Sequence, residues 1–535
     1  TSLPNFRQGD AIILYERNSD TDNVTNKMVF KGNIEYLTEN EISIRLRATQ
    51  QNPSVLPAES LYAIEHDTMD TTFRSMYQGL YIYLSARKER RDLLLSQRPP
   101  RFDESLDSMI SRSEDDFTRI ALKAKAAQDY FLLIGPPGTG KTSCALKKMV
   151  ETFHADKDAQ ILLLSYTNRA VDEICKSLAS IAPAVDFIRV GSELSCDEAY
   201  RGHLIENELS SCNRRSEVYE RIRNCRIIVG TVAAISGKPE LFRLKHFDVA
   251  IIDEATQILE PQLLGILCAR GEDGKDAIDK FVLIGDHKQL PAVVQQNTEQ
   301  SAIYDESLLS IGLTNLKDSL FERLYRNCTA TVHRSYDMLC RQGRMHPEVA
   351  LFANRAFYGG RLIPVGLPHQ IESSDTICRL AFYPSVPEKA GASAKINYSE
   401  ARIVADLAAR IYEDHQTDFD ESRTLGIITP YRSQIALIKK EIESLGIPAL
   451  NRILVDTVER FQGSERDVII YSFCVNYPYQ LKFLSNLTEE EGVLIDRKLN
   501  VALTRARKQM FITGVPELLE RNPLYKSLLK LIESF

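Results

Sequence analysis

The residues at positions 135–142 have the spacing of a phosphate-binding loop. They are Gly-Pro-Pro-Gly-Thr-Gly-Lys-Thr, which matches the pattern G-x-x-x-x-G-K-[ST]. The apolar run 130–134 precedes them and is typical of a buried strand, and residues 144–150 are typical of the start of a helix. Glycines let backbone N–H groups surround phosphate oxygens, and a helix N-terminus favours negative charge. An ordinary glycine-rich turn is the alternative, but strand, motif and helix in this order favour phosphate binding.

This loop predicts a site for a nucleoside triphosphate with Mg²⁺. Lys141 is placed to reach the outer phosphates, and the Thr142 hydroxyl is placed to bind the metal. The candidate nucleotide-binding residues are Gly135, Pro136, Pro137, Gly138, Thr139, Gly140, Lys141, Thr142 and Ser143.

Polar residues at the ends of two later apolar runs predict the hydrolytic chemistry. Asp253 and Glu254 close one run, and we assign Asp253 to Mg²⁺ and Glu254 to general-base activation of water. Gln257 follows on the next turn and is a candidate to orient this water or to bind the γ-phosphate. Gln289, after the run 281–285, is a candidate sensor of the same phosphate. Surface charge and loop structure are the alternatives, and the shared location at strand ends favours function.

Two arginines later in the chain are candidates for closing the site. Phosphoryl transfer gains from cationic side chains that arrive when a cleft closes. Arg344 lies in Gln-Gly-Arg-Met-His-Pro at 342–347, and Arg505 lies in the segment 500–507. Either arginine alone would more often be a surface residue. Together they predict that hydrolysis depends on lobe closure.

Composition indicates a soluble, cytoplasmic globular protein. The chain has 535 residues, 44% apolar and 26% charged, with a net charge of −7 and ten scattered cysteines. We expect reduced thiols without a metal site, and no membrane span, because no run of about 18 apolar residues occurs. Residue 1 is Thr, which predicts a processed chain or a piece of a longer one. The acidic balance argues against a basic surface overall, but it permits a narrow basic groove.

The hydrophobic pattern divides the chain into four predicted regions. Short alternating strands predict a small β-barrel at 1–67, followed by a helical stalk and linker at 68–114. The basic run 87–91 in that stalk is most simply a solvated helix face. Strand–helix alternation then predicts two α/β lobes with parallel sheets, at 115–328 and 329–535. Residues from about 191 to 222 look like a helical insertion in the first lobe.

The ordered motifs resemble those of superfamily 1 helicases, in the branch that contains the nonsense-mediated-decay helicase and the helicase half of replication nuclease–helicases. The first-lobe motifs are GPPGTGKT at 135–142, SYTNRAVDEI at 165–174, DEATQ at 253–257 and GDHKQLP at 285–291. The second-lobe motifs are QGRMHP at 342–347, ITPYRSQ at 428–434, VDTVERFQGSERDVII at 455–470 and NVALTRAR at 500–507. The likeness runs from about residue 115 to 515, and less specifically over the barrel and stalk.

The resemblance implies two RecA-like lobes and an ATPase that moves along single-stranded nucleic acid, 5′ to 3′, and separates duplexes. It supports the roles above and suggests that Glu465 contacts the nucleotide or couples the lobes. It also implies strand-gripping contacts, for which ordinary loop polarity is the alternative. These candidates are Thr167, Asn168, Thr231, Thr429, Tyr431, Arg432 and Thr457.

Other readings of function remain open at this point. The same lobes could form an NTP-driven clamp or switch without unwinding, or an inactive binding module, although the intact catalytic residues disfavour the latter. DNA is favoured over RNA as partner, from the segments 4–10 and 319–324. The protein is expected to act as a monomer, and a nuclease domain or partner could lie upstream of Thr1.

Two departures from the family concern recognition of the base. Gly343 stands where the family usually has a Tyr that stacks on adenine. Residues 115–119, Asp-Asp-Phe-Thr-Arg, lack the Gln that usually reads the adenine edge. We therefore expect poor discrimination between ATP and other triphosphates.

Overall fold

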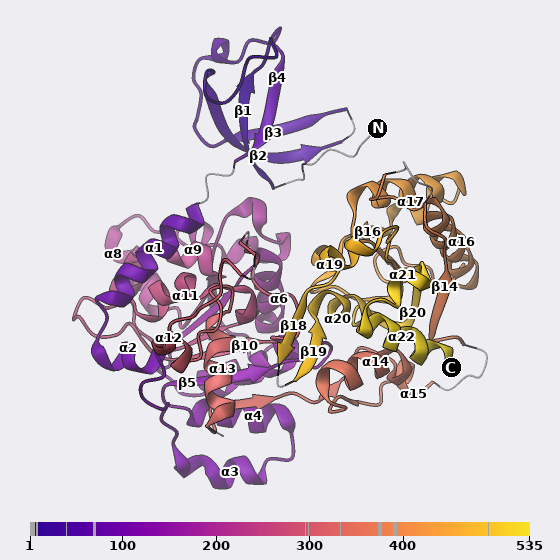
Figure 1. Cartoon of the computed structure of the whole chain (residues 1–535). Coiled ribbons are helices and arrows are strands. Elements are labelled where there is room, and N and C mark those ends of the chain that lie inside the picture. Colours follow the sequence, from indigo (N-terminus) through magenta and orange to yellow (C-terminus); the bar gives the residue numbers. More distant parts are fainter. Residues whose placement is uncertain are drawn as a thin grey trace.

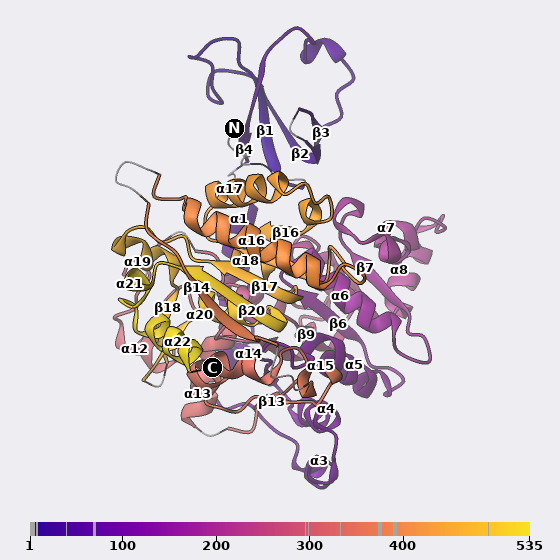
Figure 2. The ribbon, with the colours of Figure 1, turned by 90° about the vertical axis from the view of Figure 1, so that its right-hand side faces the viewer.

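The structure, a computed structural model, describes residues 6, 9–38, 40–67, 71–294, 296–297, 299–331, 333–372, 377–388, 393–490 and 492–534. Four residues of the segment 4–10, on which part of the DNA preference rests, lie outside these described residues: 4, 5, 7 and 8. Two α/β lobes lie beside each other, and a small sheet stands apart above them (Figures 1 and 2). Within the described parts, no helix combines the length and apolar character that a bilayer crossing requires.

The N-terminal region is a four-stranded antiparallel sheet in the order β3-β2-β1-β4. We expect a small barrel here from the sequence, and in the described residues β3 and β4 are the two edges of the sheet. Residues 29–37 form one continuous strand. The strands are β1 Ala11–Glu16, β2 Val29–Leu37, β3 Ile42–Leu46 and β4 Tyr62–His66.

A helical stalk joins this sheet to the first lobe and packs on it. Its helices are α1 Thr71–Leu84, α2 Lys88–Leu94 and α3 Asp107–Arg112. We predict from the sequence that the basic run 87–91 forms a solvated helix face. The structure agrees only in part, because Arg90 is buried. Its Nη2 donates to the carbonyl oxygens of Ile278, at 2.5 Å, and Asp279, at 3.1 Å. Arg90 therefore fixes the stalk to the first lobe.

The first lobe is a seven-stranded parallel sheet in the order β11-β5-β10-β9-β6-β8-β7. Apolar side chains cover both of its faces, which explains why its strands are nearly continuous hydrophobic runs. The edge strand β11 lies beyond residue 328, the predicted end of this lobe. The strands are β5 Tyr130–Ile134, β6 Ile161–Ser165, β7 Phe187–Val190, β8 Ile227–Thr231, β9 Phe247–Ile252, β10 Ile278–Gly285 and β11 Tyr336–Met338.

Helices of the first lobe connect and cover these strands. The segment between β7 and β8, where we predict an insertion, contains short helical segments. The helices are α4 Asp116–Ala126, α5 Lys147–His154, α6 Asn168–Ala179, α7 Ile205–Glu208, α8 Arg215–Asn224, α9 Val232–Ser236, α10 Glu240–Leu244, α11 Glu260–Leu267, α12 Glu306–Ser310 and α13 Leu320–Ala330.

The second lobe is a five-stranded parallel sheet in the order β14-β20-β17-β15-β16, also covered on both faces. Two small two-stranded sheets accompany it. The strands are β12 Arg341–Gln342, β13 Ile363–Pro364, β14 Leu380–Pro384, β15 Leu425–Ile428, β16 Leu454–Asp456, β17 Arg466–Ser472, β18 Leu487–Glu490, β19 Val493–Asp496 and β20 Ala506–Gly514. The helices are α14 Pro347–Tyr358, α15 Pro368–Ile371, α16 Tyr398–Asp414, α17 Arg432–Ser444, α18 Val458–Phe461, α19 Leu481–Leu484, α20 Arg497–Leu503, α21 Pro516–Leu519 and α22 Pro523–Glu533.

The contact between α1 and α11 depends on two facing glycines. A Cβ atom at Gly79 would lie 2.3 Å from the backbone oxygen of Pro261, and one at Gly265 would lie 3.1 Å from the Cα of Gly79. The two helix backbones therefore approach too closely for a side chain at position 79. This close approach holds the stalk against the lobe.

We predict that Gly79→Ala destabilises the protein by about 1–3 kcal/mol, because the two helix backbones must move apart. Gly202→Ala is the matched control, since a Cβ there meets no atom of the described residues within 4 Å. Urea denaturation measures both. Equal stability of the Gly79 and Gly202 variants would show that α1 does not pack on α11 as described.

Candidate functional site

The phosphate-binding loop connects β5 to a π-helical turn, Lys141–Leu146, that continues into α5. Gly138 and Gly140 have φ angles of +74° and +75°, a backbone conformation that side chains disfavour. The second lobe packs directly on this loop. The Gly343 N–H donates to the Gly138 carbonyl oxygen at 2.8 Å, and a Cβ at Gly138 would lie 2.4 Å from the Arg344 Cβ. The predicted loop and the predicted arginine segment therefore meet.

The predicted hydrolytic side chains meet in front of the loop. The Thr142 hydroxyl donates to Asp253 Oδ2 at 2.5 Å, and Lys141 Nζ lies 3.1 Å from Glu254 Oε1. The side-chain amide of Gln257 donates to Glu254 Oε2 at 3.0 Å. A hydroxyl and a carboxylate oxygen side by side form the hard-oxygen environment that Mg²⁺ prefers. The residues present therefore fit the cofactors that the sequence predicts.

Burial and mutual charge perturb the pKa values of this cluster. Burial, reinforced by the charge of Glu254, raises the pKa of Asp253. Burial would also raise the pKa of Glu254, but the neighbouring charge of Lys141 outweighs it and lowers that pKa. Burial opposes the charge of Lys141, and the surrounding carboxylates raise its pKa nevertheless. One lysine thus balances the carboxylates of the buried Asp253 and the partly buried Glu254, and a phosphate must compete with Glu254 for the lysine.

Glu254 itself sits in a constrained backbone conformation. Its φ of +53° is in the left-handed region, where residues other than glycine are uncommon and are often found at functional sites. The turn that follows, Ala255–Gln257, carries Gln257 back to the Glu254 carboxylate. The bend at the end of β9 therefore points the carboxylate toward Lys141.

A buried hydrogen-bonded chain joins the predicted sensor Gln289 to the second lobe. The Gln289 amide and the Tyr358 hydroxyl both donate to Asp286 Oδ2, each at 2.7 Å. The Asn500 amide donates to the Tyr358 oxygen at 2.8 Å and to the Lys288 carbonyl at 2.7 Å. We did not predict roles for Asp286, Tyr358 or Asn500. Asp286 and Asn500 lie within motifs that we quoted, whereas nothing in the sequence pattern marks Tyr358.

The two candidate arginines lie together with Glu465. Arg344 Nε donates to Glu465 Oε2 at 2.5 Å. Arg505 is buried and donates to the carbonyl oxygen of Val501 at 3.0 Å. Burial, together with the charge of Arg344, lowers the pKa of Arg505 to about 9. Two neighbouring arginines beside one carboxylate, which pairs with Arg344, favour binding of a further anion.

The candidate nucleic-acid residues lie at the carboxyl ends of strands in both lobes. Thr167 and Thr231 follow or end β6 and β8, and their hydroxyls accept the backbone N–H groups of Ala170 and Ala234 as helix caps. Thr429 follows β15, and its hydroxyl is buried without a hydrogen-bond partner in the described structure. The remaining candidates occupy the same edges: Asn168 begins α6, Tyr431 and Arg432 flank the start of α17, and Thr457 precedes α18.

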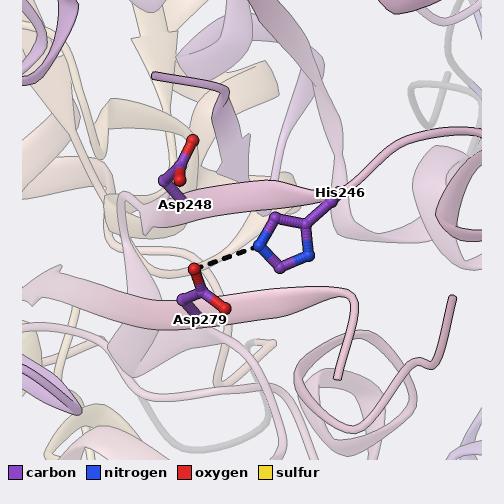
Figure 3. A group of neighbouring side chains, drawn as sticks. All are labelled: His246, Asp248 and Asp279. Atoms are coloured by element: carbon purple, nitrogen blue, oxygen red, sulfur yellow. Dashed lines mark ion pairs between the residues drawn. The ribbon is translucent and has the colours of Figure 1, made fainter. Parts of the chain in front are cut away.

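A separate group of possible cation ligands lies at the opposite edge of the first sheet. His246, Asp248 and Asp279 gather at the amino-terminal ends of β9 and β10 (Figure 3). His246 Nε2 pairs with Asp279 Oδ2 at 3.0 Å, and both side chains are about half exposed. Asp248 already accepts the Gln160 N–H at 2.6 Å. These surface contacts account for the group, and we assign it no part in the site at the loop.

Comparison with known proteins agrees with the two-lobe site. Family models described as AAA domain match residues 112–218 with 205–297, and residues 316–517. The DNA replication ATP-dependent helicase/nuclease JHS1 of Arabidopsis thaliana is 28% identical over 99% of this chain and 38% of its own length. The corresponding helicase/nuclease DNA2 of Bos taurus is 27% identical over 99% of this chain and 50% of its own length. The chain thus spans half or less of these two relatives.

The DNA polymerase alpha-associated DNA helicase A of Saccharomyces cerevisiae is 24% identical over 86% of this chain and 73% of its own length. Among solved structures, an arterivirus helicase in complex with DNA covers 76% of this chain and 65% of its own length, with 15% identity and a TM-score of 0.38.

We predict that Tyr358→Phe lowers kcat for triphosphate hydrolysis about tenfold and changes KM little, because Asp286 of the sensor loop loses its donor from the second lobe. Tyr525→Phe is the matched control, since the Tyr525 hydroxyl makes a similar bond, at 2.9 Å to Asp496, within one lobe. Each variant loses one buried hydrogen bond, which costs about 1–3 kcal/mol of stability. Thermal unfolding shows whether the two variants lose similar stability. Equal kcat values in the two variants would contradict a coupling role for Tyr358.

Proposed function

Because the chain belongs to the superfamily 1 helicases, we propose that it is a nucleic-acid-dependent ATPase that moves along single strands and unwinds duplexes. The observation that carries this proposal is the meeting of the phosphate loop with arginines from the opposite lobe, through Gly138 and Gly343. We propose DNA as the favoured strand and 5′ to 3′ as the direction. The names of the relatives support DNA, and the family resemblance supports the direction.

The first step that the site supports is an exchange of partners at Lys141. Without phosphate, Lys141 pairs with Glu254. Binding of a triphosphate offers Lys141 a more highly charged partner, so the Lys141–Glu254 pair opens. The Glu254 carboxylate is then free to accept a proton from the attacking water, and Gln257 remains positioned to orient it. Bound Mg²⁺ would neutralise developing phosphate charge. Thr142 and Asp253 are the residues that would hold it.

Hydrolysis then depends on the second lobe. Arg344 is held by Glu465, and Arg505 by backbone oxygens of its own lobe. We propose that both turn toward the γ-phosphate, because charge developing there in the transition state attracts them. The chain Gln289, Asp286, Tyr358 then links the state of the γ-phosphate to the position of the second lobe. The residues that we propose to grip the strand lie in both lobes, so a change in lobe spacing would move the contacts of one lobe relative to those of the other.

The proposal predicts that single-stranded DNA raises the rate of ATP hydrolysis and that ATP drives displacement of a strand from a 5′-tailed duplex. Glu254→Gln should retain nucleotide binding and lose at least about a hundredfold in turnover, because the general base is lost. Hydrolysis is measured with matched DNA and RNA oligonucleotides, and displacement with 5′- and 3′-tailed duplexes.

Each outcome of these assays has a defined meaning. If DNA stimulates hydrolysis but no tailed duplex is separated, the proposed unwinding activity is wrong and the protein acts as a clamp or switch. Greater stimulation by RNA would overturn the preference for DNA. Unchanged hydrolysis by Glu254→Gln would remove the general-base assignment.

We also propose weak selection of the nucleotide base. Gly343 lies against the phosphate loop, and it offers no ring to stack on a base. Residues 115–119 offer no amide either: Asp115 caps α4 by accepting the Thr118 N–H at 2.7 Å, and the Phe117 ring faces Gly140. Contacts to the phosphates would then supply most of the affinity.

We predict that kcat/KM values for ATP, GTP and CTP agree within about tenfold, the scale of a single lost aromatic contact. Gly343→Tyr should raise the preference for ATP several-fold. Among the described residues, a Cβ at Gly343 meets Leu367, at 3.3 Å, and Val365, at 3.9 Å, so a side chain there needs little adjustment. Steady-state hydrolysis of the three nucleotides tests this. A strong preference for ATP in the unaltered protein would contradict weak base selection.

A further inference from the structure

Two exposed aromatic rings and a third, partly buried one form a surface on the second lobe, in a segment to which no role has been assigned. A 3₁₀ turn, Pro478–Gln480, runs directly into α19. Tyr479 and Phe483 are therefore four residues apart on one helical face, and they are 55% and 71% exposed. Tyr477 stacks on Tyr479 with ring centroids 5.7 Å apart and planes 14° from parallel. We call Tyr477, Tyr479, Lys482 and Phe483 the Tyr479 patch.

The backbone that displays these rings is firmly held. Asn476 and Gln480 are buried on either side of Tyr477 and Tyr479. The Asn476 amide donates to the Ile396 carbonyl at 2.7 Å, and the Gln480 amide donates to the Ala394 carbonyl at 2.8 Å. Exposed rings on a fixed backbone lose little conformational freedom when they bind a ligand.

The Tyr479 patch adjoins the predicted strand-gripping edge. The Gln480 amide also donates to the Tyr431 hydroxyl, at 3.1 Å. Tyr431 lies two residues after Thr429, at the carboxyl end of β15. Figure 1 shows α19 on the side of the second lobe that is turned toward the first lobe. The rings thus continue the line of candidate contacts beyond Thr429 and Tyr431.

The charges around the rings fit a polyanion. Lys482 lies on the same turn, and Lys395 and Arg432 are exposed on the neighbouring segments. Of the nearby acidic side chains, Glu388 is engaged by the Tyr398 N–H at 2.6 Å, and Glu489 lies on the adjoining hairpin strand β18. Aromatic rings interleaved with cations are the surface on which single-stranded nucleic acids stack their bases, whatever the sequence.

We propose that the Tyr479 patch stacks bases of the single strand next to the part gripped by Thr429. This inference rests on the proposed function, because it names a further contact for the same strand. The ligand is an unpaired strand, since base faces are covered in a duplex. Stacking needs a flat ring at position 479 and does not need the tyrosine hydroxyl.

Fluorescence anisotropy with a labelled oligothymidylate measures the consequence in the full chain. Tyr479→Ala should weaken binding about tenfold, and Phe483→Ala by a similar factor. Tyr479→Phe should bind as the unaltered protein does, whereas Tyr479→Leu, which is apolar but not flat, should bind as weakly as Tyr479→Ala. Tyr77→Ala and Tyr81→Ala are matched controls, since both rings are 74% exposed on α1, in the stalk. Thermal unfolding verifies that each variant is folded.

The results separate this proposal from the proposed function. If the unaltered protein does not bind the oligonucleotide, the proposed function fails first. If it binds and Tyr479→Ala binds equally well, the Tyr479 patch is not a contact. If Tyr479→Leu binds like the unaltered protein, or the controls on α1 weaken binding equally, base stacking at the Tyr479 patch is overturned.

Discussion

The balance of charge between Lys141 and the carboxylates of Asp253 and Glu254 is the constraint on which the candidate site depends. Buried carboxylates are unfavourable unless they are paired, and here the phosphate loop supplies both partners, an ammonium and a hydroxyl. The loop therefore does more than hold phosphate. In the structure it holds both carboxylates in place: Lys141 pairs with Glu254 and lowers the pKa of that carboxyl group, and the Thr142 hydroxyl donates to Asp253. In the proposed mechanism, a triphosphate becomes the partner of Lys141 and releases the proposed general base, Glu254, in the same event.

The second lobe completes this arrangement in two places. At the loop, glycine at position 138 lets the segment carrying Arg344 approach the phosphate-binding backbone. At Asp286, one carboxylate oxygen accepts a donor from each lobe, the Gln289 amide and the Tyr358 hydroxyl. A buried acceptor that loses either donor carries a desolvation cost. Asp286 therefore favours those relative positions of the two lobes in which both donors reach it. This makes Asp286 suited to transmit the state of the nucleotide from the first lobe to the second.

The features that could be predicted from the sequence are mainly those formed by residues adjacent in the chain. The loop 135–142, the ends of β9 and β10 and the parallel strands all appear as short motifs or apolar runs, and the fold class is confirmed. Features formed by distant segments were missed. Arg90 was interpreted as solvated because burial against Ile278 depends on the stalk packing, and Tyr358 looks like any aromatic residue at the end of a helix. The short strand β11 joins the first sheet through backbone pairing with β5. The sequence of its three residues does not indicate this pairing.

The central claim is that nucleotide hydrolysis changes the spacing of two lobes that share one site. The most direct measurement is the distance between spin labels, one on the exposed face of each lobe, with no nucleotide, with ADP and with ADP–aluminium fluoride, each with a single-stranded oligonucleotide present. The account predicts that the transition-state analogue gives a shorter and narrower distance distribution than ADP, because it draws Arg344 and Arg505 toward the γ-phosphate position. Identical distributions in all three states would contradict it.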